Sequence, residues 1–238
     1  MLMFRSTLFN LCMMLATMLF SILLLLSRPF GFSPAWFWGR CWSASIIHLA
    51  QWICGIRFRF EGLEHLPDTP CVVLAKHQSA WETIAMPSLI PPFVWVLKRE
   101  LFHIPVFGWA LWALNAIAIR RSNPRAALKQ VIAQGQAFIR QGRWIVIFPE
   151  GERVAPGTTG NYQSSGIMLA HRAGTGILPM AHNAGLCWPK NSFIKRPGTI
   201  TVRFLPFIPP QEVTDTPRDK MVERVRDMIE HATKEIGG

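Results

Sequence analysis

The sequence predicts an α/β fold in which a mostly parallel central sheet of about seven strands is covered by helices and follows an N-terminal membrane-anchoring helical segment. From residue 56 onward, short apolar runs rich in β-branched and aromatic residues alternate with runs of helical period, which is typical of a largely parallel sheet. Before residue 56 the chain is strongly apolar and contains no acidic residue. We therefore divide it into N-terminal membrane-associated helices, residues 1–55, and one folded domain, residues 56–238.

The first helix is expected at Leu8–Leu26, a run of 19 residues without a charge. A helix of that length reaches about 28 Å, which is close to the thickness of the hydrocarbon core of a bilayer. The run is longer than the apolar part of a secretory signal peptide, and no clear small-residue cleavage site follows it. We expect an uncleaved membrane anchor.

A second apolar stretch, Trp36–Ile53, is expected to form an interfacial helix, because its polar residues fall within one narrow arc at helical spacing. These residues are Arg40, Ser43, His48 and Gln51. The two segments would form either a spanning helix with a surface helix or a hairpin that enters one leaflet.

The charge of the chain favours a membrane partner. Residues 1–60 contain five arginines and no acid, and the formal net charge of the whole chain is +11. Such a combination suits anionic lipid headgroups, and the positive-inside tendency favours a cell (inner) membrane protein with its folded domain on the cytoplasmic face. No nucleic-acid partner is expected, because the basic residues form no run and the aromatic residues cluster in the apolar N-terminal part.

The strands and helices of the folded domain are predicted from the periodicity of the apolar residues and from the residues that start and stop helices. Strands are expected at Ile56–Phe60, Cys71–Ala75, Phe93–Leu97, Ala116–Ile119, Trp144–Phe148, Ile177–Met180 and Thr199–Phe204. Helices are expected at Trp81–Leu89, Phe107–Leu114, Pro124–Gln141, Tyr162–Ala173 and Arg218–Ile236. Residues 206–217 are rich in proline and are interpreted as a connection before the last helix.

Polar residues follow four of these strands at the point where each strand ends. They are Lys76 and His77 after the second strand, Lys98 after the third, Arg120 and Arg121 after the fourth, and Glu150 and Gly151 after the fifth. The carboxyl ends of parallel strands line one crevice, so we expect these side chains to share a site.

His77 and Glu82 form the sharpest local pattern. If Glu82 lies in the first turn of the following helix, its carboxylate can accept a hydrogen bond from the imidazole and fix its tautomer. Such a dyad suits direct attack of a hydroxyl on an activated acyl group. The rival assignment, a serine hydrolase with Ser79 as nucleophile, is disfavoured because no G-x-S-x-G elbow occurs. A purely structural role for His77 is the other alternative.

Phe148–Arg153 is a second motif, in which a strand ends in a turn that carries an acid, a glycine and a base. Glycine permits a close backbone approach, and arginine offers a bidentate fork to phosphate. The alternative is an ordinary turn with solvated charges. A metal site is not expected, because the other histidines are scattered without H-E-x-x-H and the five cysteines form no C-x-x-C pair.

These two motifs, in this order and about 70 residues apart, resemble the glycerophospholipid acyltransferase family, whose hallmarks are His, four residues and Asp, then Phe-Pro-Glu-Gly-Thr-Arg. Between them, Lys98–Leu101 with Pro105 and Gly108, and then Ile117–Arg121, resemble the second block of the family. Ile177–Met180 resembles its fourth block. The resemblance covers about residues 70–182.

The resemblance implies that a fatty acyl group passes from a thioester, acyl-CoA or acyl carrier protein, to the sn-2 hydroxyl of 1-acyl-sn-glycerol 3-phosphate. Phosphatidic acid would be the product, and no metal or cofactor would take part. It also implies that His77 is the general base, that Glu82 orients it, and that the acceptor site is formed by Lys98, Arg121, Glu150, Gly151 and Arg153.

Three departures from the family pattern leave the acceptor open: Glu82 stands where the family usually has Asp, Glu152 where it has Thr, and Arg120 where an acid often precedes the matching Arg. Another lysolipid, such as a lyso-ornithine lipid or a lysophospholipid with a larger headgroup, is therefore the alternative acceptor. A non-catalytic lipid-binding membrane protein would explain the anchor and the charge but not the ordered blocks.

Overall fold

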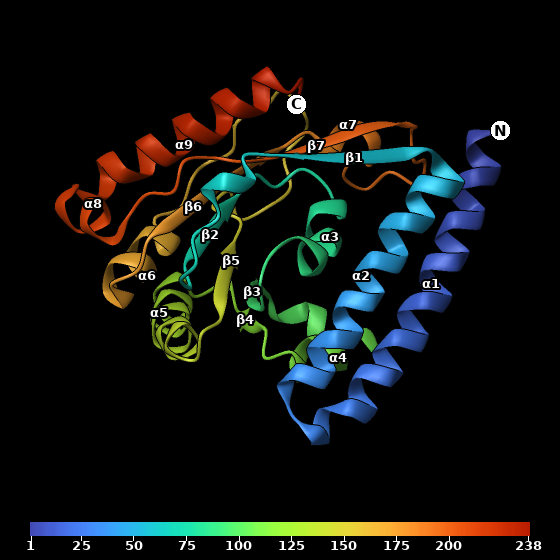
Figure 1. The fold of residues 1–238 in the computed structure, drawn as a ribbon, viewed down its shortest axis with the longest axis horizontal. Helices are drawn as coiled ribbons and strands as arrows, with labels where there is room; N and C mark the ends of the chain where they lie inside the picture. The colour runs from blue at the N-terminus through green and yellow to red at the C-terminus, as the bar shows by residue number, and fades with distance from the viewer.

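The computed structural model describes all residues, 1–238, and is built around one seven-stranded sheet. The strand order is β1-β7-β6-β2-β5-β3-β4, and only the β6–β7 pair is antiparallel (Figure 1). The strands are β1 (Ile56–Glu61), β2 (Val72–Ala75), β3 (Phe93–Lys98), β4 (Ile117–Ile119), β5 (Trp144–Ile147), β6 (Ile177–His182) and β7 (Gly198–Phe204). The predicted mostly parallel sheet of seven strands is confirmed.

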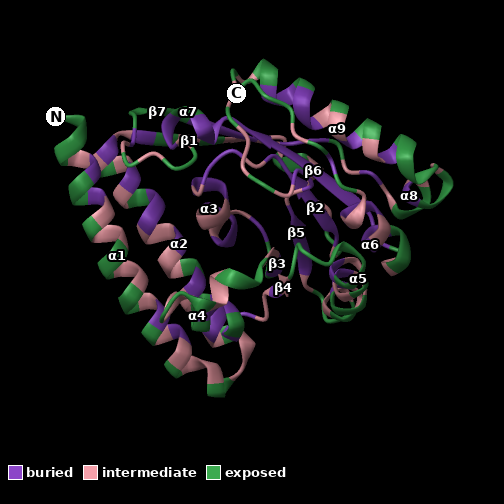
Figure 2. Cartoon of the chain, turned by 180° about the vertical axis from the view of Figure 1, so that it is seen from behind, coloured by how far each residue is buried: buried purple, intermediate pink, exposed green.

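Helices cover both faces of the sheet, so the central strands β2 and β5 are buried along their whole length (Figure 2). This burial on two sides explains why they are continuously apolar instead of alternating. The helices are α1 (Leu2–Ser27), α2 (Phe32–Cys54), α3 (Trp81–Leu89), α4 (Phe107–Ala113), α5 (Pro124–Arg140), α6 (Ser165–Ala173), α7 (Ala184–Cys187), α8 (Pro210–Asp215) and α9 (Arg218–Glu235).

Each face of the sheet has its own hydrophobic core. One core joins the sheet to α2, α3 and α4, and the other joins it to α5, α6 and α9. The five helices predicted for the folded domain are all present, with α6 beginning three residues later than expected. Residues 206–217, interpreted as a connection before the last helix, also contain the short helix α8, which begins at Pro210. Proline suits this first position, where a helix needs no backbone N–H donor.

The first two helices form an antiparallel hairpin that packs beside the domain (Figure 1). Helix α1 with the turn after it, Leu2–Phe30, contains an 18-residue window with a mean hydropathy of 2.3 and is long and apolar enough to cross a membrane. Most of its surface is exposed. Helix α2 lies between α1 and α3, and Trp36 packs edge-on against Phe93 of β3 with 5.2 Å between ring centroids.

The expected polar arc of α2 needs one correction. Ser43 is fully buried, and its hydroxyl donates to the carbonyl of Ala85 at 3.1 Å and accepts from Ser88 at 2.8 Å. The periodicity placed Ser43 with exposed residues such as Arg40 and His48, but α3 supplies hydrogen-bond partners that the sequence pattern does not reveal. The polar surface of α2 is therefore narrower than predicted.

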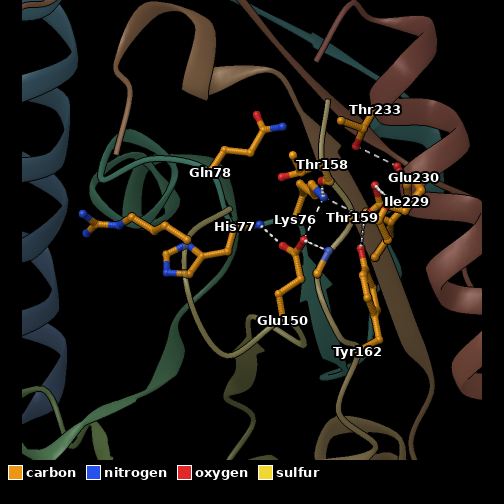
Figure 3. A network of polar contacts seen from close by, with 12 residues as sticks. Lys76, His77, Gln78, Glu150, Thr158, Thr159, Tyr162, Ile229, Glu230 and Thr233 are labelled. Atoms are coloured by element: carbon orange, nitrogen blue, oxygen red, sulfur yellow. Dashed lines mark hydrogen bonds and ion pairs between the residues drawn. The ribbon is translucent and has the colours of Figure 1, made fainter. Parts of the chain in front are cut away.

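A buried ion cluster ties the last helix to the segment that follows β2. Lys76 is fully buried, and its ammonium group donates to Glu150 and Glu230 at 2.7 Å each and to the carbonyl of Thr158 at 2.9 Å (Figure 3). Glu230, on α9, also accepts from the hydroxyl of Tyr162 at 2.8 Å. Two carboxylates around one cation leave an excess negative charge, and burial together with Glu230 raises the pKa of Glu150 despite the contact with Lys76.

Replacing Lys76 with methionine should destabilise the protein by about 3–5 kcal/mol, because two buried carboxylates lose their only cation. Thermal and chemical unfolding of purified protein in detergent would measure the change. The double variant K76M/E230Q should recover part of the loss, since it removes one of the two uncompensated charges. Lys220→Met, at an exposed lysine of α9, is the matched control and should unfold like wild type. Wild-type stability of K76M would contradict the assigned role of the cluster.

Candidate active site

His77 and Glu82 meet where β2 passes into α3. The Oε1 atom of Glu82 accepts hydrogen bonds from His77 Nδ1 at 2.9 Å, from the Gln78 N–H at 3.0 Å and from the Ser79 N–H at 2.8 Å. Ser79 in turn accepts from the N–H of Trp81 through its hydroxyl at 3.0 Å. This reciprocal arrangement resembles a capping box, in which a side chain from the first turn reaches back to the residue that caps the helix. The start of α3 therefore fixes the carboxylate.

The arrangement leaves the other ring nitrogen of His77 available as a base. With Nδ1 directed at Glu82, the neutral imidazole carries its proton there and has a free lone pair on Nε2. The ring stacks on Phe148, with 4.0 Å between centroids and 15° between planes. Ser79 is fully buried and its hydroxyl accepts from the N–H of Trp81, which contradicts the serine hydrolase alternative.

The electrostatics keep Glu82 ionised. Burial alone would raise the pKa of this carboxyl group, but the hydrogen bonds from His77 and from the Ser79 N–H outweigh burial and lower the pKa below its ordinary value. Because the pKa is lowered in the folded state, ionised Glu82 stabilises the fold at neutral pH. That contribution is lost as the pH falls through the lowered pKa.

A second histidine lies buried beside the dyad. His182, at the end of β6, is fully buried, and its Nε2 lies 2.7 Å from the carbonyl of Lys76 while its Nδ1 accepts from the N–H of Ala184 at 3.2 Å. These partners define a neutral ring with the proton on Nε2. Burial lowers the pKa of His182, which agrees with that assignment. The sequence interpretation counted His182 among scattered histidines and gave it no role.

The predicted crevice exists as a cavity of about 1300 Å³ at the carboxyl ends of the strands. Six of the seven predicted site residues line it, namely His77, Lys98, Arg121, Glu150, Gly151 and Arg153. The seventh, Glu82, lies behind His77. The other end of the cavity runs between the N-terminal hairpin and the sheet and is apolar, with Leu24, Trp42, Trp95, Leu111 and Leu114 in its wall.

Basic residues surround the polar end of the cavity. Lys98, Arg121 and Arg153 come from the ends of three strands, and Lys190 joins them from the segment after α7. Lys190 donates to the carbonyl of Arg153 at 2.6 Å and lies 3.4 Å from the carboxylate of Glu152. The negative charge at Glu152, where the family pattern has Thr, is thus partly compensated by a lysine that the sequence interpretation did not single out.

The turn after β5 is held close to His77. The N–H of Val154 donates to the carbonyl of His77 at 2.8 Å, and the N–H of His77 donates to Glu150 Oε2 at 2.8 Å. Gly151 has a φ of +71°, a left-handed conformation that glycine adopts readily. The carboxylate of Glu150 points at Lys76 and at the backbone, as Figure 3 shows. Its contacts favour a positioning role over direct contact with an acceptor.

The long-range contacts of the buried ion cluster were not predicted. Glu230 contacts Lys76 across 154 positions, and Tyr162 contacts Glu230 across 68. Glu230 sits next to Ile229 on the buried face of α9, and an acid at such a position was the one available signal. No group of three or more His, Cys, Asp or Glu side chains in the structure could hold a metal ion.

Comparisons with known proteins identify the relatives of this chain. Residues 57–183, more than half of the 238, match the family model described as Acyltransferase. A 1-acyl-sn-glycerol-3-phosphate acyltransferase of Pseudomonas aeruginosa is 48% identical over 161 residues, which cover 68% of this chain and 63% of that protein. A protein of the same name from Cocos nucifera is 29% identical over 196 residues, 82% of this chain and 63% of that one.

A solved structure has the same fold. The 1-acyl-sn-glycerophosphate (LPA) acyltransferase PlsC of Thermotoga maritima aligns over the full length of both chains with a TM-score of 0.79, at 18% sequence identity. The aligned part of this chain spans somewhat less than two thirds of the Pseudomonas and Cocos relatives. From the extent of the family match, the chain belongs to the Acyltransferase family.

Proposed function

We propose that this protein transfers a fatty acyl group from an acyl thioester, acyl-CoA or acyl carrier protein, to the sn-2 hydroxyl of 1-acyl-sn-glycerol 3-phosphate and so makes phosphatidic acid. One observation carries the proposal: the His77–Glu82 dyad opens into a cavity with a basic end and an apolar end. A lysolipid phosphate has the same two-part chemistry. The names of the similar proteins support this assignment.

In the proposed reaction His77 acts directly on the acceptor. Its Nε2 takes the proton of the sn-2 hydroxyl while that oxygen attacks the thioester carbonyl carbon. The carbon–sulfur bond then breaks, the new ester is released, and the imidazolium returns the proton to the departing thiolate. Glu82, ionised and aligned with Nδ1, stabilises the imidazolium that forms between these steps. No metal or cofactor enters the scheme.

The acceptor phosphate is assigned to the basic end of the cavity. Lys98, Arg121 and Arg153 can approach it, while Lys190 offsets the negative charge of Glu152 at the same end of the cavity. Charge-assisted hydrogen bonds to phosphate are among the strongest polar contacts that proteins make. The hydrocarbon chains would occupy the apolar part, which α1 and α2 help to form.

The same geometry supports the membrane assignment. Because α1 lines the apolar part of the cavity and is itself largely exposed and apolar, a lysolipid could enter from the bilayer while a polar donor approaches from the water. The basic residues of the N-terminal part favour an anionic leaflet, and we assign the domain to the cytoplasmic face of the cell (inner) membrane.

His77→Ala should lower kcat by about 10²–10⁴, because general-base catalysis is lost. Glu82→Gln should lower it by a comparable factor while the protein remains folded, because the amide cannot stabilise an imidazolium. Transfer of labelled acyl groups in detergent or liposomes would measure both. Ser79→Ala, which removes the hydroxyl of the rival nucleophile, and His171→Ala, an exposed histidine, are the controls and should retain activity. An active His77→Ala variant would refute the assignment.

Lys98→Ala and Arg153→Ala should each raise KM for 1-acylglycerol 3-phosphate about 10- to 100-fold, since a hydrogen bond to a charged group contributes about 1.5–3 kcal/mol. A zwitterionic lysophospholipid, tested in parallel, should be affected little. Arg57→Ala, at an exposed arginine of β1, is the control. If both acceptors respond equally, Lys98 and Arg153 do not bind the phosphate. If the wild type acylates only the zwitterionic lipid, the acceptor is a different lysolipid.

A further inference from the structure

We infer that an exposed basic groove along α5 is the docking surface for an acidic acyl carrier protein. The inference rests on the proposed function, because it assigns a partner to the donor side of that reaction. The groove has a volume of about 440 Å³ and lies between α5 and the end of α6. Its floor includes Leu128 and Ile132, and three basic side chains border it, Arg125, Lys129 and Arg172.

The positive charge of this groove is not neutralised within the protein. Arg125, Lys129 and Arg172 are exposed, and none of them belongs to an ion pair of the structure. The sequence has no acidic residue between Glu100 and Glu150, so α5 and the turns beside it carry only positive charge. These side chains do not hold the fold together either, because α5 packs through its opposite, small and apolar face. Their charge is free to act on a partner.

The groove is continuous with the wall of the active-site cavity. Leu128 lines both hollows, and its neighbours Pro124, Ala127 and Val131 on α5 line the cavity. A protein seated on the groove would therefore lie against the helix that separates it from His77. An acyl thioester on a flexible arm of such a partner could enter the cavity around the N-terminal end of α5.

The position of the groove favours a soluble protein over the bilayer. Helices α5 and α6 lie on the side of the sheet opposite to α1, as the two opposed views in Figures 1 and 2 agree. A membrane that contacts α1 would leave this side facing water. The groove is also shallow and borders a helix of 17 residues, which suits the surface of another protein. Opposite charge on the partner would steer it to this site and speed association.

The test compares two donors that carry the same acyl chain, acyl carrier protein and acyl-CoA. The triple variant R125E/K129E/R172E should lose about 10- to 100-fold in kcat/KM with acyl carrier protein and stay within about twofold of wild type with acyl-CoA. Added salt should slow the wild-type reaction with acyl carrier protein, because screening weakens steering, and should have much less effect on the triple variant. The control R57E/K220E/K234E makes the same change of charge at exposed positions away from α5 and should match wild type.

Three results would overturn the inference. They are a triple variant equal to wild type with acyl carrier protein, equal impairment of the triple variant with both donors, and a wild type that accepts acyl-CoA alone. In each of these cases acyl transfer by the wild type persists, so the proposed function stands without the docking surface. If the folded wild type transfers from neither donor, the proposed function itself fails, and the inference fails with it.

Discussion

The geometry of the site depends on one buried carboxylate oxygen. Glu82 Oε1 accepts three hydrogen bonds, one from the ring of His77 and two from the backbone N–H groups of Gln78 and Ser79. A buried carboxylate without such donors would carry a large desolvation cost. The donors come from the loop that enters α3, so the same contacts begin the helix, keep the carboxylate ionised and aim the imidazole at the cavity. Glu82 has one methylene more than the Asp of the family pattern, and the hydrogen bond to His77 still forms with this longer side chain.

A second layer of contacts fixes the backbone on which the dyad stands. Lys76 precedes His77 and is held between Glu150 and Glu230, while Glu150 also accepts the N–H of His77. These three charged residues come from the segment after β2, the turn after β5 and α9. The cluster therefore fixes the backbone of His77 relative to the turn after β5 and to α9. Tyr162 completes it by donating to Glu230.

The sequence was sufficient for the sheet and for the members of the site, because both follow from local patterns. Apolar runs marked the strands, and polar residues at their ends marked the crevice that now contains His77, Lys98 and Arg153. Local patterns could not predict contacts between distant segments, since no residue near Lys76 in the sequence indicates a partner 154 positions away. Ser43 was misplaced for a related reason, because helical periodicity cannot show which polar residue finds its partner inside the protein.

The central claim is that His77 activates the acceptor for direct attack, without an acyl group bound to the enzyme. Rapid mixing of purified protein with an equimolar amount of acyl thioester, first without and then with lysolipid, tests it most directly. Direct attack predicts negligible thiol release and an unchanged protein mass until the lysolipid is added, and then thiol and ester in equal amounts. Release of one equivalent of thiol before that addition, with a protein mass increased by one acyl group, would contradict it.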